Sequence, residues 1–316
     1  MTTTEIQYTT TGDSRRAQMS RYHRKPEPRD LSKGAKNNDI AQLKSTERVN
    51  LSQVGTDFHS KFTIGMEVEK NSLARGARKE YALFCGFETD SSCGYEAVTN
   101  ILPLLPAGQW RNKVYNMFVE AKRVIEDSYS PSDSRCGGHI TIAVEGMTGE
   151  ELLEKVRVNA GIILALFRKR LSNHYCNNNI TMLPFRDNDD AIGSTQTRYQ
   201  VALAKGNVLE FRIPSRFQSV KQMMRRYELM YELLDFSINN PNGSHSAFLK
   251  KVEPIVRSMY AGDTEKTKEI MTLAKSFRKM ILTNKVNRDV INFVDPRRRL
   301  NAERFYDRDL MTNGYH

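Results

Sequence analysis

The sequence predicts an α+β protein with an antiparallel sheet and a helical C-terminal third. Apolar and polar residues alternate over residues 61–69 and again over 138–144, which is typical of strands. After Pro214 the apolar residues instead recur at helical spacing. A chain of 316 residues is long enough for one large domain with tails or for two smaller domains.

Three regions are expected along the chain. Residues 1–60 hold ten basic and seven acidic residues and few branched apolar side chains. We interpret them as a flexible basic arm, because such a composition cannot bury enough apolar surface to fold alone. Residues 61–240 are expected to form the main domain. Residues 241–316 are expected to form a helical extension packed on that domain.

The main domain is expected to contain several strands, one of which is entered at Glu96. The others are predicted at residues 61–69, 79–87, 138–144, 199–204 and 208–213. The last two are separated by Lys205-Gly206-Asn207, which can form a hairpin turn. The sequence therefore predicts that these two strands pair with each other.

Helices are expected between the strands and throughout the C-terminal third. They are predicted at residues 110–125, about 148–170, about 217–238, 245–260, 264–283 and 286–293. Thr148 is followed three residues later by Glu151, which is the pattern of a capping box at the start of a helix. The Asn- and Asp-rich stretch 176–196 is expected to be a loop.

The composition argues against a membrane protein and against a secreted one. Mean hydropathy is −0.58, and no run approaches the roughly 18 apolar residues of a membrane span. The N-terminus lacks the basic flank and apolar stretch of a signal peptide. The four cysteines show no C-x-x-C spacing, which argues against a zinc ribbon or a disulfide framework. We therefore expect a cytoplasmic protein with reduced thiols.

The charge indicates a class of partner. Lys and Arg number 48 against 37 Asp and Glu, so the formal net charge is +11. Excess positive charge favours anionic partners such as nucleotides or nucleic acid. Because the basic residues are spread along the chain, we expect at most weak nucleic-acid binding by the basic segments.

The first candidate site residues are Glu67 and Glu69 in the first predicted strand. Period two places both carboxylates on one face of that strand, and two carboxylates at this spacing can hold a divalent cation. A solvent-facing strand side has the same pattern. The pair alone therefore does not establish a metal site.

Three further segments contribute polar residues. Glu96 follows a turn-like segment and offers a third carboxylate. His139 follows a glycine pair and lies on the strand face opposite Ile140, where it can ligate a metal or contact a phosphate. Glu210 and Arg212 share one strand face and suit metal and phosphoryl binding, although an ordinary ion pair would look the same. Together, the segments predict a sheet with one carboxylate-rich face, which is a candidate platform for metal and nucleotide.

The order of these motifs resembles the amidoligase branch of the glutamine-synthetase-like carboxylate–amine ligases. The resemblance covers about residues 62–235, and members encoded by bacteriophages are the most similar, so we expect a phage protein that acts in the host cytoplasm. The matching motifs are G-x-E-x-E (Gly65, Glu67, Glu69), D-x-S with G-x-E (Asp90, Ser92, Gly94, Glu96), C-G-x-H (Cys136, Gly137, His139), R-Y (Arg198, Tyr199) and E-F-R (Glu210, Phe211, Arg212).

The resemblance implies a fold, an activity and a set of roles. Residues 61–240 would form the catalytic domain, with a glutamine-synthetase-like sheet cupped around the active site and backed by helices. The enzyme would use ATP and Mg²⁺ to join an amine to a peptide or amino-acid carboxylate through an acyl phosphate. Two or three Mg²⁺ ions would be held by Glu67, Glu69, Glu96, His139 and Glu210.

The implied catalytic residues are two arginines. Arg212 would neutralise the charge that develops on the transferred phosphoryl group. Arg198 would hold a phosphate or the substrate carboxylate. Together with His139, both arginines would contact the nucleotide.

One departure from the family leaves alternatives open. The family often has a second histidine at the position of Thr141. A catalytically inactive fold, reused as a phage structural or nucleic-acid-binding protein, would explain that change, the basic arm and the basic run at residues 297–299. A metal-dependent nuclease would use the same carboxylates without ATP. A homo-oligomer is also expected, because relatives of this fold often form rings.

Overall fold

The computed structural model describes residues 59–77, 81–90, 92–172 and 201–283, together with short strands in the N-terminal region. These are β1 (Thr9–Thr10), β2 (Ala17–Gln18) and β3 (Ala35–Lys36). β1 pairs with β2, and β3 pairs with β4 (His59–Ser60), both antiparallel. The chain divides into two compact units. The first comprises residues 1–146 and 216–227, and the second comprises residues 147–215 and 228–316.

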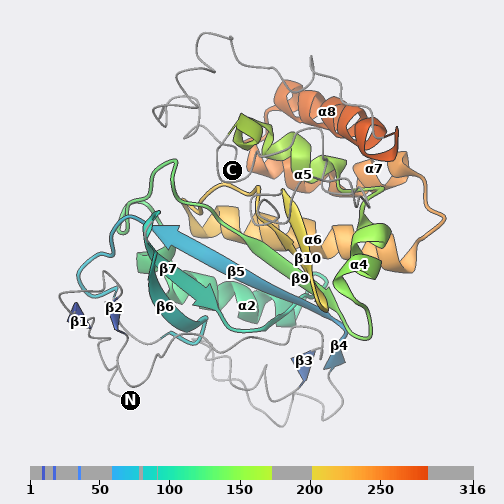
Figure 1. The fold of residues 1–316 in the computed structure, drawn as a ribbon. Coiled ribbons are helices and arrows are strands. Elements are labelled where there is room, and N and C mark those ends of the chain that lie inside the picture. Colours follow the sequence, from blue (N-terminus) through green and yellow to red (C-terminus); the bar gives the residue numbers. More distant parts are fainter. Residues whose placement is uncertain are drawn as a thin grey trace, which may run out of the picture. The chain divides into compact units, whose positions relative to one another are not determined.

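The first unit contains an antiparallel sheet built around one long strand (Figure 1). Its strands are β5 (Phe62–Lys70), β6 (Phe84–Asp90), β7 (Gly94–Thr99), β8 (Leu102–Pro103) and β9 (Ile140–Val144). β5 pairs with β9, β8 and β7, and β7 pairs with β6. All four pairings are antiparallel, which confirms the predicted sheet type.

β5 is buried on both of its faces. Ile64, Met66 and Val68 are fully buried on one face, as the alternating pattern predicts. On the other face, Thr63 is fully buried and Glu69 is only 6% exposed. The solvent-facing interpretation of this strand side is therefore wrong for Glu69, because Gly137 and His139 contact its carboxylate.

β6 begins later than the sequence predicts. The strand expected at residues 79–87 starts only at Phe84, after a turn at residues 82–83. The backbone N–H of Phe84 donates to the carbonyl of Tyr81, and the two rings meet edge to face at 5.9 Å. The apolar residues before Phe84 are thus core residues of a turn. The sequence pattern does not distinguish such residues from the buried residues of a strand.

The helix expected at residues 110–125 is divided into two. α2 (Gln109–Glu120) and α3 (Lys122–Ile125) are separated at Ala121, whose φ of −88° and ψ of 11° leave the helical region. Val114, Met117 and Phe118 of α2 are fully buried. An interruption of one residue preserves this apolar spacing, so the sequence pattern could not reveal it.

In the second unit, the helix predicted from Thr148 is shorter than expected. The capping box at its start is confirmed, but α4 (Gly149–Val156) ends well before residue 170. A short helix, α5 (Gly161–Leu166), and a 3₁₀ helix, η3 (Arg168–Ser172), follow. All six residues of α5 are buried. A helix that is apolar on every side has no amphipathic pattern to mark where it begins or ends.

The predicted hairpin is confirmed in this unit. β10 (Ala202–Lys205) pairs antiparallel with β11 (Val208–Phe211), and Lys205 lies opposite Val208. The turn is therefore Gly206-Asn207. Gly206 has a φ of +55°, a conformation that glycine adopts without the steric cost of a side chain.

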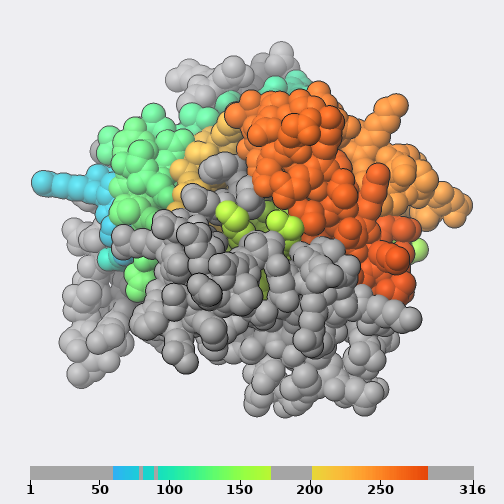
Figure 2. Space-filling model, turned by 90° about the horizontal axis from the view of Figure 1, so that it is seen from above, coloured from blue at the N-terminus to red at the C-terminus, as the bar shows by residue number. Residues whose placement is uncertain are grey.

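Three long helices confirm the helical character of the described part after Pro214. They are α6 (Val220–Asn239), which begins in the first unit and ends in the second, α7 (His245–Met259) and α8 (Thr264–Thr283). The outer sides of α7 and α8 form the orange surface in Figure 2. None of the helices in the described ranges is both long and apolar enough to cross a bilayer. The predicted helix at 286–293 and the predicted loop at 176–196 lie outside the described residues.

Candidate metal site

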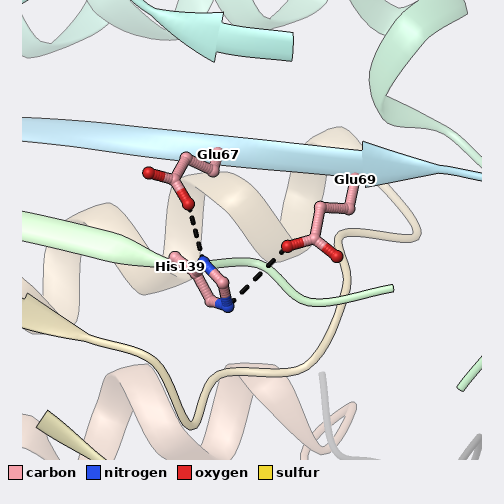
Figure 3. Close-up of side chains that lie close together, drawn as sticks. All are labelled: Glu67, Glu69 and His139. Atoms are coloured by element: carbon pink, nitrogen blue, oxygen red, sulfur yellow. Dashed lines mark hydrogen bonds and ion pairs between the residues drawn. The ribbon is translucent and has the colours of Figure 1, made fainter. Parts of the chain in front are cut away.

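Three predicted site residues come together in the first unit. Glu67 and Glu69 project from β5, and His139 immediately precedes β9, which is hydrogen-bonded beside β5 (Figure 3). The backbone N–H of Glu67 donates to the carbonyl of His139 at 3.0 Å. The backbone pairing thus places a histidine beside two glutamates that are 72 and 70 positions away in the sequence.

The three side chains are close enough to share a cation. Nδ1 of His139 lies 2.6 Å from Oε2 of Glu67, and Nε2 lies 3.7 Å from Oε1 of Glu69 (Figure 3). One ligand atom from each residue lies within 4.8 Å of the others. A divalent cation with bonds of about 2.0–2.2 Å bridges donor atoms about 3–4.4 Å apart. The geometry therefore fits a divalent ion after a small adjustment.

The donor set also fits such an ion. Carboxylate oxygens suit Mg²⁺ and Mn²⁺, and imidazole nitrogen suits transition metals. When Nδ1 of His139 donates its proton to Glu67, Nε2 presents a lone pair on the side of Glu69. A carboxylate commonly orients a metal-binding histidine in this way. The side chains are 8–23% exposed, so an ion bound here would be partly shielded from water.

Gly137 orients Glu69, a role that the motif alone did not reveal. Its backbone N–H donates to Oε2 of Glu69 at 2.6 Å. A Cβ atom at this position would lie 2.9 Å from Nε2 of His139 and 3.2 Å from Oε1 of Glu69. Glycine therefore allows the backbone to approach the cluster closely. The glycine pair before His139 was the available signal, but a glycine in a sequence does not indicate which atom it approaches.

Glu96 lies next to the cluster but outside it. It is the direct cross-strand neighbour of Glu69, on β7. Among the described residues, however, the group with metal-binding spacing contains only Glu67, Glu69 and His139. Glu88 of β6 lies opposite Glu96 in turn, so three glutamates form a row across three strands. Glu88 was not predicted, because the strand expected at residues 79–87 ended one residue before it, whereas β6 continues to Asp90.

Glu210 and Arg212 lie in the second unit and form an ion pair there. Nη1 of Arg212 is 2.5 Å from Oε1 of Glu210, and the ammonium of Lys205 contacts Oε2 of the same carboxylate. Both oxygens of Glu210 thus face cations, which agrees with the ion-pair interpretation. Their roles at the metal cluster stay predictions. Arg198 lies outside the described residues, so its role also stays a prediction.

The fold and the cluster define an α+β protein with a candidate divalent-metal site on an antiparallel sheet. No protein-family model matches the chain, and no curated protein matches it. Among solved structures, the chain is similar to apo GmaS without ligand, a gamma-glutamylmethylamide synthetase. The alignment covers 92% of this chain and 80% of the GmaS chain, with 12% sequence identity and a TM-score of 0.33. A sequence identity and a TM-score this low assign neither a family nor an activity. The amidoligase resemblance and the phage origin therefore stay predictions.

Proposed function

We propose that the protein is an ATP- and Mg²⁺-dependent carboxylate–amine ligase. It would form an amide bond on a peptide or amino-acid carboxylate through an acyl phosphate. The main support is the cluster of Glu67, Glu69 and His139. These residues come from two separate motifs of the resemblance, and the fold brings them within metal-binding distance.

The residues of the first unit have distinct parts in this proposal. Glu69 and His139 offer ligand atoms, Glu67 orients the imidazole and offers a second carboxylate, and the Gly137 N–H holds Glu69 in place. A bound Mg²⁺ would offset the repulsion between phosphate oxygens and an incoming carboxylate. The carboxylate-rich site would repel an anionic nucleotide without such a cation.

The remaining roles follow from the resemblance. Glu96 and Glu210 would complete the metal ligands, and Arg212 and Arg198 would bind the transferred phosphoryl group and the substrate carboxylate. For Glu210 this requires an exchange of partners. Its carboxylate would have to release Lys205 or Arg212 before it could bind a cation.

A hydroxylamine trap tests the ligase activity without knowledge of the amine. The protein is incubated with ATP, Mg²⁺, hydroxylamine and a panel of amino acids and peptides, and hydroxamate and ADP are measured. We expect both products from the wild type. The variant Glu67→Gln should form them more than about 100-fold more slowly, since even changes outside the ligand shell cost 10- to 100-fold. Glu145→Gln, an exposed glutamate that follows β9, is the matched control and should retain activity.

A melting experiment separates nucleotide binding from turnover. ATP with Mg²⁺ at about 100 times its dissociation constant should stabilise the wild type by about 2.7 kcal/mol, and this gain should disappear in Glu67→Gln. Stabilisation without hydroxamate would move the search to other substrates. If ATP gives neither stabilisation nor product while Mn²⁺ still binds, the chain has a metal site but is not an ATP-dependent ligase.

A further inference from the structure

An ion pair between a buried lysine and a partly exposed aspartate lies directly beside the metal cluster. Lys70 follows Glu69 on β5, and its side chain is 0% exposed. Its ammonium donates to Oδ1 of Asp127 at 2.7 Å and to the carbonyl of Phe217 at 2.8 Å. Because side chains alternate along a strand, Lys70 points to the face opposite Glu69. It therefore does not belong to the donor set.

Asp127 is the centre of a small polar network in the same unit. Its carboxylate accepts a hydrogen bond from Oγ of Ser132 and lies 3.5 Å from Nε of Arg216. Its backbone N–H donates to the carbonyl of Gln218 at 3.0 Å. These contacts define the start of the irregular segment 126–139 and attach it to the end of β5.

The far end of this segment supplies His139, one of the three residues of the metal cluster. At that end, the Gly137 N–H contacts Glu69, and the backbone of His139 pairs with Glu67. At the near end, Lys70 binds Asp127, and the N–H of Asn71 donates to the carbonyl of Pro131 at 2.9 Å. The segment is thus attached to β5 at the two glutamates and again at the residues that directly follow them.

Stability alone is a weak explanation for such a pair. Burying a lysine removes its hydration, and apolar residues of similar size often replace a buried ion pair with no loss of stability. A directional contact does what apolar packing does not, because it sets the register of one segment on another. A shift of the segment by even 1 Å would move Gly137 and His139 away from Glu69.

We infer that Lys70 and Asp127 are positioning residues, which hold Gly137 and His139 at binding distance from the carboxylates of β5. The inference rests on the proposed metal site, although it does not require the ligase reaction. It predicts that metal affinity depends on a pair of residues that do not touch the metal.

The test uses Mn²⁺ alone as the probe, bound to the full chain and followed by the electron paramagnetic resonance signal of the free ion. The variants are Lys70→Met, Asp127→Asn and the double variant. Asp127→Asn leaves the buried ammonium of Lys70 and the buried guanidinium of Arg216 without their carboxylate, so it should lower both the melting temperature and the affinity. Lys70→Met leaves Asp127 paired with Arg216, so it should lower the affinity with a smaller loss of melting temperature. The double variant also removes the buried Lys70 charge, so it should melt at a higher temperature than Asp127→Asn, but it should bind Mn²⁺ about 10-fold more weakly than the wild type.

Two controls keep the result interpretable. Lys61→Met removes the same charge from an exposed position just before β5 and should leave Mn²⁺ affinity unchanged. Asp127→Glu retains the charge but lengthens the side chain by one methylene, so it serves if the double variant does not fold. It should likewise weaken Mn²⁺ binding and shift the visible absorption bands of bound Co²⁺, which report ligand geometry.

The outcomes distinguish the inference from the site on which it rests. A folded double variant, or an Asp127→Glu variant, with wild-type Mn²⁺ affinity would overturn the positioning role alone. A wild type that does not bind Mn²⁺ would overturn the metal site as well. Wild-type binding without ligase activity would contradict the proposed reaction and leave the positioning role supported by the variants.

Discussion

His245 is a titratable residue at the start of α7 in the second unit. Its Nδ1 lies 3.1 Å from Oδ1 of Asn159. Burial, together with the nearby cations Arg278 and Lys275, lowers the pKa of His245 to about 4. An unfolded chain protonates this imidazole near pH 6.5. Below that pH the unfolded state binds a proton that the folded state does not, so stability is lost as the pH falls toward 4.

We expect His245→Gln to reduce this acid sensitivity. The difference between the pH 7.5 and pH 5 unfolding free energies should shrink by about 1 kcal/mol, a value reduced for partial solvent screening of a half-buried group. Urea unfolding of wild type and variant at both pH values measures it. Equal pH dependence in the two proteins would contradict the lowered pKa.

At the same scale, the sequence predicted the residues of the candidate metal site better than the residues that support them. Glu67, Glu69 and His139 were predicted because their side chains have metal-binding chemistry and lie in recognisable motifs. Gly137 and Lys70 were not assigned their parts. A backbone N–H has no sequence signature, and a lysine in a strand gives no sign of whether it is buried against an aspartate.

At the scale of elements, the start of α4 depends on a local signal. The Oγ1 of Thr148 accepts from the N–H of Glu151 at 3.2 Å, and the Glu151 carboxylate accepts from the N–H of Thr148 at 2.8 Å. Thr148→Ala should destabilise the protein by about 1 kcal/mol, because the first turn loses this cap. Thr148→Ser, the matched control, should stay within a few tenths of a kcal/mol.

Chemical denaturation of the three proteins measures this difference. Equal losses in the alanine and serine variants would mean that the methyl group, rather than the hydroxyl, is what matters. A local signal of this kind can be predicted because all its atoms lie within four consecutive residues. The end of α4 has no comparable signal, which is why its predicted length was wrong.

At the scale of the whole molecule, the two compact units lead to a test of their independence. In the second unit α5 and α8 pack closely at Gly161, where a Cβ atom would lie 2.4 Å from the carbonyl oxygen of Ala274 and 2.8 Å from the backbone nitrogen of Arg278. These are backbone atoms of a helix, so they cannot move aside cheaply. Overpacking of this kind costs about 1–3 kcal/mol.

We therefore expect Gly161→Ala to lower the melting temperature of the second unit. Mn²⁺ binding should stay intact, because Glu67, Glu69 and His139 belong to the first unit. Calorimetry with and without Mn²⁺ measures both effects. A loss of Mn²⁺ affinity comparable to the loss in Glu67→Gln would show that the units do not behave independently.

The sequence by itself determined the elements with a regular period or a short-range signal. These are β5, the β10–β11 hairpin, the start of α4 and the three long helices. It also predicted the polar residues of the candidate metal site. Periodicity and capping depend on neighbours within a few positions, so they are visible in one dimension.

Only the tertiary structure decided which of those residues meet. The pairing of β5 with β9 places His139 beside Glu67 and Glu69, and the pairing of β5 with β7 places Glu96 on the neighbouring strand. The path of segment 126–139 brings Asp127 to the buried Lys70. Contacts between residues about 60 to 70 positions apart depend on strand register and on the path of segment 126–139. These follow from packing of the whole unit, which no local pattern encodes.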